Sequence, residues 1–76
     1  MTDVFELIKA EMRRQDAKWG ADRNLDDYVW LAILTEEVGE SAESVLKETH
    51  EHTQEEVVQV AAVAAQWLEC MLRRLK

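Results

Sequence analysis

The sequence predicts an all-α fold, in which a helical hairpin-type protomer of about three helices forms a single domain over residues 1–76. Apolar residues recur with the period of an α-helix along most of the chain, and only short polar stretches interrupt that pattern. No strand pattern, internal repeat or low-complexity segment competes with this interpretation. Because a chain of 76 residues buries a smaller fraction of its surface than an average domain, we expect a homo-oligomer that completes a four-helix-type bundle.

The first helix is expected to begin at Asp3 and to stop at Gly20. Asp3, with Glu6 three residues later, has the pattern of a capping box, in which side chains bind the free amides of the first turn. The apolar positions that give this helix its moderate amphipathicity are Val4, Phe5, Leu7, Ile8 and Met12.

The second helix is predicted to follow a short polar connector and to run to about Lys47 or Glu48, with Asn24 or Asp26 as its N-cap. On a helical wheel its apolar arc consists of Leu31, Leu34, Val38, Ala42, Val45 and Leu46. Glu37 lies at the edge of this arc, so we expect its carboxylate to be partly covered when the helix packs.

The third helix is predicted to follow a turn at residues 49–52, with Thr53 and Glu56 as a capping box, and to extend almost to the end of the chain. Its apolar arc consists of Val57, Val58, Val60, Ala61, Ala64, Ala65, Trp67, Leu68, Met71, Leu72 and Leu75. This arc is wider than the single stripe of a surface helix. We therefore expect a subunit interface, in a dimer or tetramer, that includes Ala61, Ala64, Ala65 and Leu68.

The net charge of −7 is concentrated in the middle of the chain. Residues 36–56 contain eight acidic residues and one basic residue, Lys47, while acidic and basic residues balance elsewhere. An acidic patch of this kind repels a phosphate backbone, so we expect no direct binding of duplex nucleic acid. A nucleotide bridged by a metal ion stays compatible with the patch, because the cation inverts the local electrostatics.

The single cysteine, Cys70, excludes a disulfide within the chain, and we expect it to be a small core or interface residue. The sequence shows no secretory signal pattern and no apolar run long enough to span a bilayer. We therefore expect a cytoplasmic protein that does not bind membranes.

Carboxylates recur three residues apart in two segments of the chain. Glu37 and Glu40 share one helical face, and Glu56 with Gln59 repeats the spacing in the third helix. Carboxylates this close raise each other's pKa unless solvent or a cation relieves the repulsion, so the two interpretations are a solvated acidic face and a metal site. We predict a site for a hard divalent cation, formed by Glu37, Glu40, Glu56 and Gln59. Two roles stay open for Gln59, because its amide can bind the ion through oxygen or hydrogen-bond a neighbouring carboxylate.

The pattern Glu37-x-x-Glu40, a gap of 15 residues, and Glu56-x-x-Gln59 resembles the Glu-x-x-Glu…Glu-x-x-Asp signature of the MazG-like, all-α nucleoside triphosphate pyrophosphohydrolases. The segments 14–20 and 58–67 also resemble small phage and mobile-element members of that family, so the resemblance covers most of the chain. The chain departs from the signature at Gln59, where the family has an aspartate.

This resemblance implies that the cation is Mg²⁺, with Mn²⁺ as an alternative. It also implies an enzyme that cleaves a nucleoside triphosphate between the α and β phosphates, giving the monophosphate and pyrophosphate. Glu36 or Glu40 would orient or deprotonate the attacking water. The alternative is a non-catalytic, degenerate MazG-like module for nucleotide binding or assembly, which the departure at Gln59 favours.

The resemblance also implies nucleotide contacts from the end of the first helix. Trp19, and likewise Trp30, would stack on the base, while Arg14 and Lys18 would bind phosphate. The competing interpretation is that each tryptophan only packs against the core. His50 and His52 suggest a transition-metal site, but residues 49–52 are better interpreted as a solvated turn.

Overall fold

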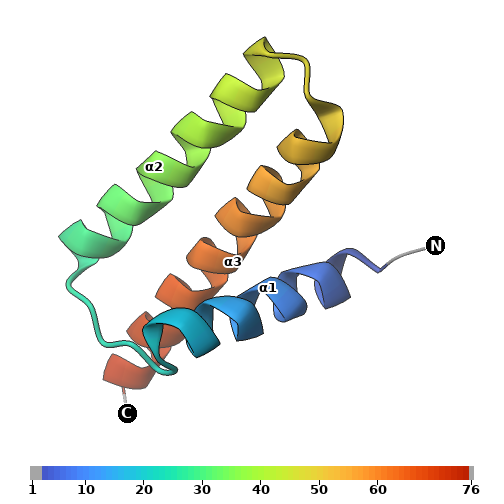
Figure 1. Ribbon diagram of the computed structural model, residues 1–76. Coiled ribbons are helices and arrows are strands. Elements are labelled where there is room, and N and C mark those ends of the chain that lie inside the picture. Colours follow the sequence, from blue (N-terminus) through green and yellow to red (C-terminus); the bar gives the residue numbers. More distant parts are fainter. Residues whose placement is uncertain (1–2, 76) are drawn as a thin grey trace.

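A computed structural model describes residues 3–75, which form three α-helices: α1 (Val4–Trp19), α2 (Asp27–Leu46) and α3 (His50–Arg74) (Figure 1). Helices α2 and α3 form an antiparallel hairpin, and α1 lies across the C-terminal half of α3 (Figure 1). Within residues 3–75, α1 packs against α3 without close backbone contact to α2, and no strand is present. The all-α class with three helices is therefore confirmed.

The predicted ends of the first two helices are set by local capping. The side chain of Asp3 accepts a hydrogen bond from the Phe5 amide at 2.8 Å, and Asp26 accepts one from the Tyr28 amide at 2.8 Å. Gly20 ends α1 with a φ of +99°, a conformation that glycine adopts more readily than other residues. Of the two N-caps considered for α2, the structure therefore uses Asp26.

The predicted turn at residues 49–52 and the Thr53 capping box are wrong. Glu48 adopts a left-handed conformation with a φ of +57°, and the Thr49 amide bonds the Ser44 carbonyl at 3.2 Å, so the chain reverses before residue 50. Helix α3 begins at His50, and the Thr53 hydroxyl donates to the Thr49 carbonyl at 3.0 Å inside its first turn. As a result, both histidines are helical rather than part of a loop.

The predicted apolar arc of α2 does not form its main packing face. Leu31 and Val38 are each 50% exposed, whereas Trp30 is only 1% exposed and packs with Ile33 toward α3. Trp30 is the largest side chain on this helix, so its burial favours a rotation that sends the smaller aliphatic side chains outward. The same rotation turns Glu37 toward the hairpin interior.

The hydrophobic core lies between α2 and α3. It consists of Trp30, Val63 and Cys70, with Leu25, Ile33, Leu34 and Trp67 packed against them. The core position expected for Cys70 is confirmed. Side-chain hydrogen bonds join the helices at its edge. The buried Gln66 donates to Asp16 of α1 at 3.0 Å, and the half-buried Trp67 donates to the exposed Asp27 of α2 at 3.0 Å. In the described part of the chain, none of the helices has the length and apolar character needed to cross a bilayer.

Candidate metal centre and adjoining pocket

Three of the four predicted metal ligands converge inside the hairpin. Glu37 and Glu40 from α2 and Glu56 from α3 each place one carboxylate oxygen within 4.8 Å of the other two. Glu56 is 6% exposed and the other two are partly buried. The i, i+3 spacing puts the first pair on one face of α2, and the antiparallel packing brings Glu56 to them.

The carboxylates of this cluster lie in an environment that disfavours their charge. Burial raises the pKa of Glu37 to about 7, and the nearby Glu40 and Glu56 carboxylates add to the effect. Burial and the Glu40 carboxylate also raise the pKa of Glu56. The Oε2 atoms of Glu37 and Glu56 are buried and have no hydrogen-bond partner among the residues described. Buried oxygens without a donor are costly, and hard divalent cations prefer such ligands, so the cluster fits Mg²⁺ or Mn²⁺.

The raised pKa of Glu37 predicts that the metal-free protein loses stability as the pH rises. Folding favours the protonated acid, so this contribution is fully present below pH 4.5 and is lost as the pH rises through about 7. Glu37→Gln removes this pH dependence. In chelator at pH 8, and with screening of this partly exposed group allowed for, the variant should be more stable than the parent by about 1–2 kcal/mol.

Urea unfolding at pH 5 and pH 8, at one protein concentration, measures this difference. Glu43→Gln is a suitable control, because Glu43 is exposed on the same helix and its pKa is lowered by Lys47 rather than raised. The control variant should gain no stability at pH 8. If the free energy of unfolding changed equally between pH 5 and pH 8 in the parent and in Glu37→Gln, the prediction would be contradicted.

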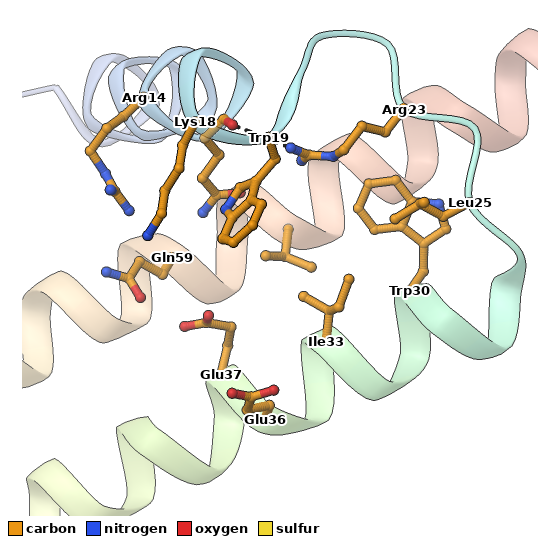
Figure 2. A pocket seen from close by; sticks show the side chains of 12 residues that line it. Arg14, Lys18, Trp19, Arg23, Leu25, Trp30, Ile33, Glu36, Glu37 and Gln59 are labelled. Carbon is orange, nitrogen blue, oxygen red and sulfur yellow. Dashed lines mark hydrogen bonds between the residues drawn. The ribbon is translucent and has the colours of Figure 1, made fainter.

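A pocket of about 570 Å³ adjoins the cluster, between α1, the α1–α2 connector and α2, with α3 as its floor (Figure 2). Its lining residues are Arg14, Gln15, Lys18, Trp19, Arg23, Leu25, Trp30, Ile33, Glu36, Glu37, Gln59 and Val63. Figure 2 shows Arg14 and Lys18 extending from α1 toward Gln59, with Glu37 on the opposite side. Cationic side chains on one wall and carboxylates on the other suit a phosphorylated ligand that carries a divalent cation.

The two tryptophans of this pocket have different roles. Trp19 is 65% exposed and the Lys18 amine lies 4.9 Å from its ring centroid, so the alternative that it packs against the core is wrong. Its ring has an open face on which a base can stack. Trp30 is buried in the core under Arg23, which lies 5.6 Å from its ring, and contributes only to the pocket wall. Its predicted role in stacking is therefore replaced by a packing role.

The other predicted site residues line the adjoining pocket. Gln59 lies one turn after Glu56 and also lines a groove between α1 and α3, so it separates the pocket from that groove together with Arg14. Arg14 is held by Glu11 through two hydrogen bonds of 2.9 and 2.6 Å. Glu36 is exposed at the pocket edge (Figure 2).

Sequence reasoning assigned His52 to a solvated turn and missed Arg23, although both residues lie near the site. His52 lies with its Nε2 atom 3.2 Å from Oε1 of Glu56, and the i, i+4 spacing would have indicated this contact if α3 had been predicted to start at His50. Arg23 of the connector reaches the pocket beside Trp30, and a lone arginine in a polar loop gave no signal for this position.

Comparison of the chain with protein-family models, with curated proteins and with solved structures gives no match. The functional proposal therefore depends on the residues and geometry of the site.

Proposed function

We propose that this chain is a MazG-like, Mg²⁺-dependent nucleoside triphosphate pyrophosphohydrolase. The observation that carries the proposal is the convergence of Glu37, Glu40 and Glu56 beside a pocket whose opposite wall is basic and aromatic. The resemblance of the two acidic motifs to the MazG-like signature supports the same function. A solvated acidic face does not account for Glu56, because its side chain is buried and one of its oxygens lacks a donor in the described residues.

Glu37, Glu40 and Glu56 would hold Mg²⁺, or Mn²⁺ in its place. When bound, the ion supplies neutralisation of phosphate charge and a lowered pKa for bound water. Glu36 or Glu40 would accept the proton of the attacking water or orient it, since Glu36 borders the pocket and Glu40 belongs to the adjoining cluster. Gln59 contributes an amide that binds the ion or fixes a neighbouring carboxylate.

The pocket beside the cluster would bind the base and the phosphates of the nucleotide. Its volume of about 570 Å³ is within the range for small-molecule sites. Trp19 stacks on the base, and Lys18 with Arg14 binds the phosphates from the α1 side. Arg23 adds a third cationic side chain at the opposite end, above Trp30 (Figure 2).

We also propose that the chain assembles as a homo-oligomer, a dimer or a tetramer, through one flank of the α2–α3 hairpin. Exposed or half-buried apolar residues on α3 and at its C-cap recur alternately four and three positions apart: Val57, Ala61, Ala64, Leu68, Met71 and Leu75. On α2 a matching stripe recurs every seven residues at Leu31, Val38 and Val45.

This spacing is typical of helices that pack along a seam in a bundle. At about 100° per residue, the α3 stripe lies opposite Gln66, which binds α1, and the α2 stripe lies opposite Glu36, which borders the pocket. Association through both stripes therefore completes a four-helix bundle and leaves the pocket open.

Incubation of the protein with a panel of ribonucleoside and deoxyribonucleoside triphosphates tests the proposed function. The expected products in Mg²⁺ are the monophosphate and pyrophosphate, with no turnover in chelator. Release of orthophosphate and a diphosphate would show cleavage of a different bond and overturn the proposal. Calorimetric binding of a nucleotide without any turnover would support the non-catalytic module instead.

Replacement of Trp19 by alanine should weaken substrate binding more than catalysis. Loss of base stacking is expected to raise KM about tenfold, with kcat changed less than about threefold. Phe5→Ala is a matched control, because Phe5 is an exposed aromatic residue of α1 outside the pocket lining. Steady-state kinetics on the best substrate of the panel gives both constants. An unchanged KM for Trp19→Ala would remove this ring from the substrate site.

A further inference from the structure

The imidazole of His52 lies between two carboxylates on the first turns of α3. Its Nε2 atom is 3.2 Å from Oε1 of Glu56, and its Nδ1 atom is 3.8 Å from Oε2 of Glu55. The His52 side chain is 60% exposed, whereas the Glu56 side chain is almost fully buried. The contact therefore joins a solvent-accessible side chain to the most buried member of the carboxylate cluster.

The two oxygens of Glu56 have different surroundings. Oε1 faces His52, while Oε2 is buried without a hydrogen-bond partner in residues 3–75. The neighbouring Glu40 carboxylate repels Glu56, and His52 is the basic side chain that opposes this repulsion. A carboxylate held through one oxygen keeps its second oxygen in a fixed direction, which favours ion binding by reducing the loss of side-chain freedom.

We infer that His52 is a positioning residue that holds the Glu56 carboxylate in its metal-binding orientation, a role that rests on the proposed metal-dependent function. The ring is not itself a member of the cluster, whose mutually close ligand atoms in the described residues come from Glu37, Glu40 and Glu56. His52 instead borders the solvent side of the cluster with Glu40 and Glu56. Its effect on an ion is therefore transmitted through Glu56.

Calorimetric titration of Mg²⁺ and Mn²⁺ into the parent and three variants tests this role. His52→Ala should weaken Mg²⁺ affinity about tenfold, the lower end of the range for residues that support a metal ligand. His52→Gln keeps an N–H donor at the same position. Its Mg²⁺ affinity should therefore stay within about threefold of that of the parent. His50→Ala is the matched control, because His50 is an exposed histidine of the same helix turn, and it should bind like the parent.

A kinetic measurement separates positioning from general damage to the fold. Saturating Mg²⁺ should restore the kcat of His52→Ala to within about twofold of the parent, because only the affinity for the ion is affected. A kcat that stays low at saturating Mg²⁺ would overturn the positioning role.

A double-mutant cycle of His52→Ala and Glu56→Gln in chelator measures the contact without metal. The two substitutions should change the melting temperature non-additively, by a few degrees. Additive shifts would overturn the inference. Equal metal affinities of the parent and His52→Ala would overturn this inference alone. A parent that binds neither Mg²⁺ nor Mn²⁺ would overturn the proposed function together with the inference.

Discussion

Glu56→Gln is expected to lower nucleoside triphosphate hydrolysis by at least about a hundredfold, the largest effect of any single substitution in this protein. Glu56 supplies the only α3 carboxylate of the cluster in the described structure, and its side chain is 8% exposed. The isosteric amide keeps the shape but removes the charge that would bind Mg²⁺. Release of pyrophosphate at saturating Mg²⁺ and substrate measures the loss.

The melting temperature of Glu56→Gln shows whether its loss of activity comes from a loss of structure. Without metal, neutralising a buried carboxylate relieves repulsion with Glu40, so the melting temperature should be equal to that of the parent or higher. Glu43→Gln is the matched control, because this exposed carboxylate pairs with Lys47 at 2.6 Å outside the cluster, and it should keep parent activity. Parent-like turnover of Glu56→Gln would place the catalytic centre elsewhere.

Leu68→Glu is expected to dissociate the proposed homo-oligomer. Leu68 is 56% exposed in the single chain and lies in the middle of the α3 stripe, so assembly would bury the new charge without a partner. The parent should sediment with at least twice the 8.8 kDa mass of one chain at micromolar concentration. The variant should sediment as one chain, or unfold if the isolated hairpin is not stable.

Ala17→Glu provides the control for this experiment, because Ala17 is an exposed position of α1 that does not border the pocket. Its mass should equal that of the parent. A parent that sediments as a well-folded single chain would contradict the proposed assembly. A parent-like mass for Leu68→Glu would instead move the interface away from the α3 stripe.

The sequence by itself determined the features that depend on neighbouring residues along the chain. The helical class follows from apolar periodicity, and Asp3, Asp26 and Gly20 set helix ends because each acts on backbone groups a few residues away. The spacing of Glu37 and Glu40 likewise places them on one face without any tertiary contact.

The start of α3 was predicted wrongly from the sequence because two local signals competed. Thr53 and Glu56 have the pattern of a capping box, but the chain already reverses at Glu48 in a left-handed conformation. Bonds from Thr49 to the Ser44 carbonyl stabilise that earlier reversal. Only the three-dimensional path of the connection decides between the two starts, and it places His52 beside Glu56.

Only the tertiary structure decided which face of α2 is buried. The wheel offers an aliphatic arc through Leu31 and Val38 and a second face through Trp30, Ile33 and Glu37, and periodicity favoured the first. Packing against α3 selects the second, because it buries the large indole of Trp30 completely, at the cost of also drawing carboxylates into the interior. That rotation brings about the partial burial of Glu37, its convergence with Glu56 and the adjoining pocket. The sequence pattern predicted the first two, but no local pattern specifies the rotation or the pocket.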